Sequence, residues 1–289
     1  MEMIEHGIEC DEGGSGVGQH RLVRPSGRVV AHFSCGAASA VATKIALEKY
    51  ETVEIVYCDT GSEHPDNKRF IADCENWFGQ SVRVVRSEKF ANIYEVFEAR
   101  RFLVSYQGAP CTAELKKIPG NTTWEIGDTE IFGYTADEKH RLERWKRDNF
   151  ERIIECPLID RHLTKEDCFG ALDRVGIELP EMYKLGFRNN NCIGCVKARD
   201  SIDYWKRVRK HFPEQFDRTA KLERELNITI NRITKDGVRS PIYLDEIEEG
   251  DPKGNDPNIQ CGLFCMNEAD SWTNDQGQPP ADTTPNPVE

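Results

Sequence analysis

The sequence predicts an α/β fold, a doubly wound and mostly parallel sheet followed by a C-terminal helical extension that carries cysteines. From residue 29 onward, short apolar runs typical of buried strands alternate with amphipathic stretches of helical period. Such alternation implies parallel strands joined by right-handed crossovers. Small and polar residues follow the first two runs, at residues 34–39 and 59–61, where ligands bind to sheets of this kind.

Strands are predicted from apolar, β-branched runs, and helices from apolar positions at helical spacing with capping residues at their starts. The five strands are expected at residues 29–33, 52–58, 82–85, 130–133 and 153–154. Helices are expected from residue 40 with Ser39 as the N-cap, at 65–78, at 90–102, and at 164–175 with Thr164 as the cap and Asp167 at the capping-box position. Two more helices are expected at 201–211 and 213–226, before a hairpin at 227–243 that turns around residues 235–237.

Changes in composition divide the chain into four parts. Residues 1–27 are polar and contain several glycines, which indicates a flexible arm. Residues 28–186 form the α/β domain, and residues 187–244 hold a Cys-x-x-Cys knuckle, helices and the hairpin. Residues 245–289 are acidic and rich in Pro and Asn, so we expect a mostly disordered tail that carries the Cys261/Cys265 motif.

Composition narrows the class of protein. The chain has 289 residues, of which 38% are hydrophobic, enough for a packed core. It has no apolar run of about 18 residues and no signal peptide, so we expect a cytoplasmic protein without a membrane segment. The net charge of −12 lies mostly in the acidic tail, so it excludes neither an anion site nor a nucleic-acid surface elsewhere. Eleven cysteines in such a chain favour metal or redox chemistry over a disulfide framework.

Residues 34–39, with the sequence Ser-Cys-Gly-Ala-Ala-Ser, form a tight loop between the first predicted strand and the first predicted helix. Small side chains let backbone N–H groups approach an anion, and the helix start adds a favourable dipole end. The spacing is neither that of a Walker A loop nor that of the dinucleotide fingerprint. The loop therefore predicts a cradle for a nucleotide phosphate or a sulfate, with an ordinary βα turn as the alternative.

The same loop resembles the PP-loop of the adenine nucleotide α-hydrolase-like superfamily, with Cys35 and Ala38 in place of a Gly and an Asp. The sulfonucleotide (PAPS/APS) reductase branch, the phosphoadenosine phosphosulfate reductase family, also lacks that Asp. Four further segments resemble motifs of this family in the same order, at residues 59–71, 110–119, 192–195 and 260–264. The chain is especially similar to phage and bacterial proteins labelled as PAPS reductase-like, whose substrates are usually unassigned.

The resemblance implies an enzyme that binds a PAPS- or APS-type adenine nucleotide and transfers or reduces its sulfur. Cys261 would attack the sulfur and form a cysteine S-sulfonate, from which a thioredoxin-like reductant would release sulfite. Thr135 stands where the family has a substrate-gripping Arg, so Lys139, Arg141 or Arg144 would substitute for it. Asp59 is the candidate for a ribose or magnesium contact. The expected nucleotide-binding residues are Ser34, Cys35, Gly36, Ala37, Ser39, Asp59, Thr60, Gly61, Gly133, Lys139 and Arg141.

Cysteines at family positions imply a metal site. Cys111, Cys192 and Cys195 match positions that ligate a 4Fe-4S cluster, and Cys265 would be the fourth ligand. The second cysteine of the family's tandem pair is absent beside Cys111, so an open iron site is an alternative. A structural zinc site formed by Cys192, Cys195, Cys261 and Cys265 is a second alternative, and a protein without metal is a third.

Two other functions stay open beside the reductase. One is an ATP-dependent sulfur transferase that thiolates tRNA or DNA with a 4Fe-4S cluster, and the other is a non-catalytic nucleotide-binding module. A basic run favours the first, because it offers a surface for a nucleic-acid backbone, although it would equally make a solvated helix face. Its members are Lys197, Arg199, Lys206, Arg207, Arg209 and Lys210. The expected partners are thus the nucleotide and a thioredoxin-like reductant or sulfur donor, with nucleic acid and a homodimer as open alternatives.

His32 is expected to be a core histidine.

Overall fold

The computed structural model describes residues 27–105, 108–254, 256–257 and 259. Its centre is a five-stranded sheet in the order β3-β2-β1-β4-β5, in which every neighbouring pair is parallel. The strands are β1 (Val29–His32), β2 (Glu54–Cys58), β3 (Arg83–Val85), β4 (Thr129–Ile131) and β5 (Ile153–Glu155). The predicted α/β fold with a parallel sheet is therefore confirmed.

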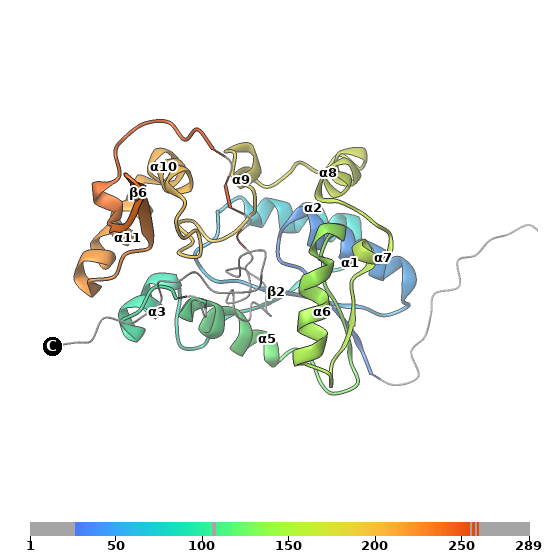
Figure 1. Cartoon of the computed structure of the whole chain (residues 1–289). Helices are drawn as coiled ribbons and strands as arrows, with labels where there is room; N and C mark the ends of the chain where they lie inside the picture. The colour runs from blue at the N-terminus through green and yellow to red at the C-terminus, as the bar shows by residue number, and fades with distance from the viewer. Residues whose placement is uncertain (1–26, 106–107, 255, 258, 260–289) are drawn as a thin grey trace, which may run out of the picture.

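Helices lie on both sides of this sheet (Figure 1). Ala31, Phe33 and Tyr57 project from one face into an apolar core shared with α1 (Ala37–Lys49), α2 (Asn67–Phe78) and α8 (Lys165–Arg174). On the other face, the Cys58 thiol donates a hydrogen bond to the backbone oxygen of Lys116, at 3.8 Å. Lys116 lies in a π-helical turn, η1 (Ala113–Lys117), between the short helices α4 (Pro110–Thr112) and α5 (Ile118–Asn121).

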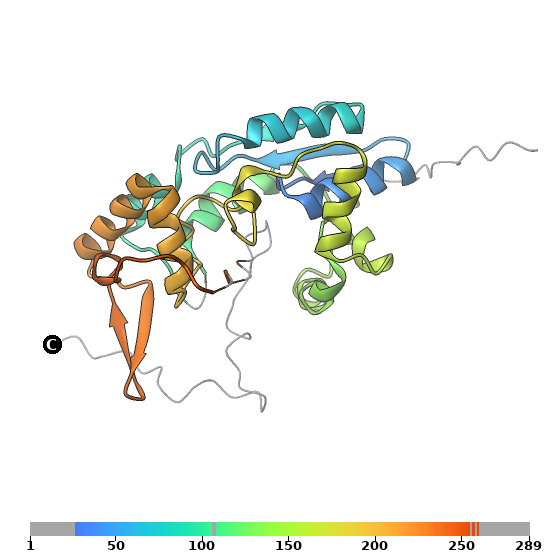
Figure 2. The ribbon, with the colours of Figure 1, turned by 90° about the horizontal axis from the view of Figure 1, so that it is seen from above.

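A second core lies in the C-terminal part of the chain. It is shared by α3 (Ile93–Arg100), α10 (Ile202–His211) and α11 (Pro213–Leu226), and the side chain of Trp205 is fully buried there. The antiparallel hairpin of β6 (Asn231–Lys235) and β7 (Val238–Ile242) projects from these helices (Figure 2). It turns at Asp236 and Gly237, as predicted. Because this core combines residues 90–115 with residues 182–259, the domain boundaries given above stay predictions.

The remaining elements are α6 (Lys139–Asp148), α7 (Pro157–Asp160), α9 (Glu181–Lys184) and the two 3-10 turns η2 (Ala136–Glu138) and η3 (Leu244–Glu246). Leu244 of η3 and Met182 of α9 belong to the C-terminal core. A third, small core forms where Trp145 of α6 packs against Phe132 and Ile154. Within the described residues, no helix has both the length and the apolar composition that a bilayer-spanning segment needs.

The start of α8 follows the prediction, whereas the start of α1 differs from it. Thr164 caps α8 by accepting a hydrogen bond from the backbone N–H of Asp167, which confirms the predicted capping box. The prediction of Ser39 as the N-cap of α1 is wrong, because the helix begins at Ala37 after Gly36. Ser39 instead works from inside the first turn, where its hydroxyl accepts the N–H groups of Gly36 (3.3 Å) and Ser34 (3.1 Å).

Candidate functional site

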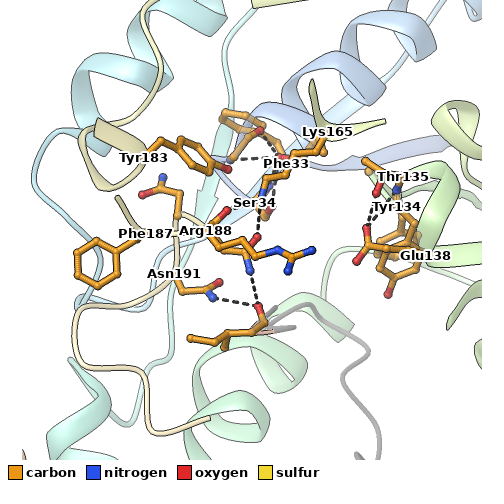
Figure 3. A pocket seen from close by; sticks show the side chains of 18 of the residues that line it. Phe33, Ser34, Tyr134, Thr135, Glu138, Lys165, Tyr183, Phe187, Arg188 and Asn191 are labelled. Carbon is orange, nitrogen blue, oxygen red and sulfur yellow. Dashed lines mark hydrogen bonds between the residues drawn. The ribbon is translucent and has the colours of Figure 1, made fainter. Parts of the chain in front are cut away.

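A cavity of about 710 Å³ lies at the carboxyl ends of β1 and β4 (Figure 3). Its volume is in the range of pockets that hold small molecules and cofactors. Four segments form most of its wall: the loop after β1, the loop after β4, the start of α8, and the segment that follows α9. Lining residues used below are His32, Ser34, Gly36, Ser39, Cys58, Lys116, Phe132, Gly133, Tyr134, Thr135, Asp137, Glu138, Arg141, Lys165, Glu166, Tyr183, Arg188, Asn189, Asn190, Asn191, Asp256 and Ile259.

The loop after β1 presents the start of α1 to the cavity. Cys35 has a φ of 59°, the left-handed region, so the chain turns sharply between the strand and the helix. The hydroxyl of Ser34 donates to that of Ser39 at 3.1 Å, and both residues line the cavity with Gly36. No acidic residue lies in the first turn of α1. The helix itself therefore supplies no negative charge at the positive end of its dipole, which suits an anion.

Gly133, in the loop after β4, is packed directly against this helix start. A Cβ atom on Gly133 would lie 2.7 Å from both the backbone nitrogen and the Cα of Ser39. Only glycine fits such a contact without moving the backbone of α1. The glycine thus lets two strand-end loops meet, and it explains why the sequence has a Gly at this predicted site position.

The segment after α9 braces the loop from the other side. The Tyr183 hydroxyl oxygen lies at the start of α1, where a Cβ atom on Gly36 would be 3.2 Å from it, and burial raises the pKa of this hydroxyl. The side-chain amide of Asn190 donates to the backbone oxygen of Cys35 (2.6 Å) and to the side chain of Asn67 (2.8 Å). The start of α1 is consequently held by groups about 150 residues further along the chain.

Two cations of this segment and of α8 face the cavity. The Lys165 ammonium donates to the backbone oxygen of Arg188 and to the side-chain oxygen of Asn189 (2.5 Å), and it lies 5.2 Å from the centre of the Tyr183 ring. Burial, with a further contribution from Arg188, lowers the pKa of Lys165 to about 8. Neither Lys165 nor Arg188 forms an ion pair within the part of the chain that the structure describes. Sequence reasoning missed both residues.

One wall of the cavity contains a buried polar network. His32 Nε2 lies 2.7 Å from Glu130 Oε2, and Arg152 binds the same carboxylate with two hydrogen bonds of 2.6 Å. Burial alone would raise the pKa of Glu130, but the hydrogen bonds from His32 and Arg152 hold it below its ordinary value. Arg152 also packs over the Trp124 ring at 3.6 Å. His32 is therefore a buried histidine, as expected, although it also lines the cavity.

On the floor of the cavity, Lys116 forms a second buried ion pair. Its ammonium lies 3.3 Å from Glu63, whose carboxylate also accepts hydrogen bonds from Tyr57 and Asn67. Lys116 is only 7% exposed, so the pair fixes the position of a cation beneath the ligand space. Lys116 belongs to the 110–119 motif but was not among the residues expected to bind the nucleotide.

The structure brings together some of the expected nucleotide-binding residues. Ser34, Gly36, Ser39, Gly133 and Arg141 line the cavity, whereas Cys35 and Ala37 are buried beneath the loop.

The other expected residues lie elsewhere. The Asp59 carboxylate accepts hydrogen bonds from Arg86 (2.9 and 2.5 Å) and does not line the cavity, and Thr60 and Gly61 follow it in the same turn. Lys139 is exposed on α6, 3.9 Å from Glu143.

Three of the four expected metal ligands share one region. Cys192 and Cys195 are buried in the C-terminal core, and Cys111 packs against that core. Thr60 Oγ1 lies 3.1 Å from the sulfur of Cys192, so the 59–61 segment is attached to the knuckle. Among the described residues, no group of three or more His, Cys, Asp or Glu side chains is arranged to hold a metal ion. Cys261 and Cys265 lie outside the described residues, so both the 4Fe-4S site and the zinc site stay predictions.

Three members of the basic run contact residues 244–256. Arg207 pairs with the buried Asp256, and Lys210 pairs with Asp251 at 2.7 Å. Arg209 donates to the backbone oxygens of Leu244 (3.0 Å) and Ile247 (2.8 Å). These contacts attach the segment after η3 to α10, which leaves little support for a nucleic-acid surface on this helix.

That segment returns to the cavity. The backbone oxygen of Ile259 accepts hydrogen bonds from the side chains of Asn189 (3.2 Å) and Asn191 (3.0 Å), and Figure 3 shows Asn191 near Arg188. Ile259 is buried and, with Asp256, lines the cavity. The chain that precedes Cys261 by two residues is thus attached to the wall of the site.

Comparisons with known proteins assign the family of the chain. The model of the phosphoadenosine phosphosulfate reductase domain matches residues 28–200. No curated protein sequence matches the chain. Among solved structures, the chain is similar to a phosphoadenylyl-sulfate (PAPS) reductase from Candida auris in complex with phosphate, with 10% sequence identity and a TM-score of 0.44. That match covers 57% of this chain and 81% of the fungal one.

Proposed function

Because the chain belongs to the phosphoadenosine phosphosulfate reductase domain family, we propose that its cavity binds an adenine nucleotide whose 5′-phosphate carries a sulfonate group, and that the protein reduces this sulfur. The observation that carries the proposal is the start of α1, which faces a cavity of nucleotide size with Ser34, Gly36 and Ser39. Backbone N–H groups at a helix start bind phosphate through hydrogen bonds and the helix dipole.

The chemistry that we propose needs a thiolate. The thiolate of Cys261 attacks the sulfur, the bond between sulfur and the bridging phosphate oxygen breaks, and the nucleotide leaves with its 5′-phosphate. The product on the protein is a cysteine S-sulfonate. A dithiol reductant then attacks the cysteine sulfur, sulfite leaves with the bonding electrons, and the reductant ends as a disulfide. The attachment of Ile259 supports this role, because two residues of chain span at most about 7 Å.

The test of the proposal is binding and turnover by the full chain. We expect binding of adenosine 3′,5′-bisphosphate in calorimetry, and release of sulfite from 3′-phosphoadenosine 5′-phosphosulfate when a thioredoxin and its reductase are supplied. Nucleotide binding without sulfite release would support the non-catalytic module instead. Release of AMP from ATP with thiolation of tRNA or DNA would support the sulfur transferase, for which the internal pairing of Arg207 and Lys210 gives little support.

Gly133→Ala tests whether the loop at α1 is the phosphate site. The added Cβ would lie 2.7 Å from the backbone of Ser39, so the start of α1 must move. We expect nucleotide affinity to fall by about tenfold or more, since one well-placed charge-assisted hydrogen bond contributes about that much. Gly170→Ala in α8 is the matched control, because its Cβ would meet nothing closer than 3.4 Å and alanine favours a helix. Unchanged affinity in Gly133→Ala would remove the loop from the site.

The 4Fe-4S cluster is a separate proposal, supported by the placement of Cys111, Cys192 and Cys195 in or against one core. Thiolates are the ligands of such clusters, and a bound cluster would supply redox-active iron. We expect anaerobically purified protein to contain iron and sulfide at about four each per chain. Loss of the metal in Cys192→Ser, but not in Cys168→Ala, would assign the ligand. One zinc and no iron per chain would support the structural zinc site instead.

A further inference from the structure

The α8–α9 side of the cavity contains donors that the phosphate loop does not use. Lys165 comes from the first turn of α8, Tyr183 from α9, and Arg188 from the segment that follows. All three line the cavity, and Figure 3 shows them around one part of it, with the Tyr183 hydroxyl pointing toward Ser34. Thr135, which stands where the family has an Arg, is occupied as the cap of η2 and lies on the opposite side.

Lys165 is held in place before any ligand binds. Its ammonium group has three N–H donors, of which the backbone oxygen of Arg188 and the side chain of Asn189 use two. The ring of Tyr183 lies under it at 5.2 Å. One donor is therefore left for a ligand, and little side-chain entropy is lost when it binds.

Tyr183 lies between the phosphate loop and Lys165. Its hydroxyl oxygen would be 3.2 Å from a Cβ atom on Gly36, and Lys165 lies over the face of its ring. Burial keeps the hydroxyl protonated by raising its pKa, and a protonated hydroxyl is able to donate a hydrogen bond to an anion.

Most acidic side chains that line the cavity already have partners other than Lys165 and Arg188. Glu138 is engaged by Arg141, Asp256 by Arg207, and Asp137 by the Thr135 hydroxyl. Glu166 lies exposed on the rim beside Lys165. Glu138, Glu166 and Asp137 still raise the pKa of Lys165 through their charge, whereas burial and Arg188 lower it to about 8.

We propose that Lys165, Tyr183 and Arg188 form a second oxyanion subsite, which binds a tetrahedral phosphate or sulfate group of the nucleotide other than the one held at α1. The inference rests on the proposed function and names the class of its substrate, a nucleotide with two separate anionic groups. Two sources fit this chemistry, a phosphate on the ribose 3′-oxygen and the sulfonate on the 5′-phosphate.

The experiment measures what each added anion contributes to affinity. Calorimetry in the Cys261→Ser background, where no sulfur is transferred, compares AMP with adenosine 3′,5′-bisphosphate and with adenosine 5′-phosphosulfate. We expect one added group to tighten binding by about tenfold or more, and we expect this gain to vanish in Lys165→Met and in Arg188→Ala. Lys184→Met is the matched control, because this exposed lysine pairs with Glu178 outside the cavity and the gain must persist there.

If the variants lose the affinity gained from the 3′-phosphate, the subsite binds the 3′-phosphate. If they lose the affinity gained from the sulfonate, it binds the sulfonate. Equal weakening of all three ligands, or no weakening, would overturn the subsite while leaving the phosphate loop intact. Failure of every ligand to bind the parent protein would overturn the proposed function together with the subsite. Glu166→Gln covers the case in which the other variants do not fold, because removal of this rim charge should tighten the ligand with the added group and leave AMP unaffected.

Proton uptake gives a readout that a structural role would not change. At pH 8, a Lys165 with a pKa of about 8 is about half protonated, and an anion beside it restores the full charge. We expect binding to take up as much as about half a proton per chain, measured by calorimetry in two buffers of different ionisation enthalpy. The uptake must be absent in Lys165→Met, and uptake that persists there would contradict the subsite.

Discussion

Cys261→Ser is expected to abolish sulfite release while leaving nucleotide binding within about twofold of the parent protein. A serine hydroxyl is a far weaker nucleophile than a thiolate, and removal of the group that forms the covalent intermediate lowers turnover by at least about a thousandfold. The measurement is sulfite release under single-turnover conditions, with adenosine 3′,5′-bisphosphate affinity measured in parallel. Mass spectrometry of the parent protein without reductant should find an added sulfonate on Cys261.

Cys168→Ala is the control for this prediction. Cys168 is fully buried in α8, and burial raises the pKa of its thiol to about 12, so it supplies no thiolate. Sulfite release that survives in Cys261→Ser would contradict the assignment. The next candidate would then be Cys58, the cysteine that lines the cavity among the described residues, although burial raises the pKa of its thiol to about 11.

Arg152→Leu is expected to destabilise the protein by about 3–5 kcal/mol, because it leaves the Glu130 carboxylate buried with only His32 as a partner. The side chains of Arg152 and Glu130 are 5% and 0% exposed, so water cannot replace the lost hydrogen bonds. Urea denaturation, with the free energy of unfolding extrapolated to water, provides the measurement.

Arg83→Leu is the comparison for this second prediction. Arg83 also pairs with a glutamate at 2.6 Å, but its side chain is 51% exposed, and pairs of this kind contribute at most about 1 kcal/mol. Similar losses in the two variants would show that burial of the Glu130 network does not determine its contribution.

Local signals explain why much of the fold was predictable. The β-branched runs, the Thr164 capping box and the hairpin at residues 235–237 depend on neighbours within a few residues, and all were confirmed. The prediction of Ser39 as the N-cap was wrong because serine is a common N-cap, and the sequence does not distinguish the cap from the third helical position. The backbone turn at Cys35 determines which of the two is adopted.

The site was predictable where it follows a strand and unpredictable where it depends on distant contacts. Ser34, Gly36 and Gly133 follow strands directly, and parallel strands bring such ends to one edge. Asp59 also follows a strand, but Arg86 takes up its carboxylate. Lys165 and Arg188 lie in segments whose helical period and polarity look like a solvated surface. The orientation of the Lys165 side chain depends on Tyr183 and Asn189, which no local sequence pattern relates to it.

The segment from Arg188 to Cys192 is fixed at three points, by Arg188 to Lys165, by Asn190 to Cys35, and by Cys192 to Thr60. Its five residues therefore have a required length as well as a required composition. The segment cannot accommodate an inserted or deleted residue, since a shift by one position would misplace Arg188, Asn190 or Cys192. Loops on the outside of the fold, such as the turn at Asp236 and Gly237, have no such constraint and should accept insertions.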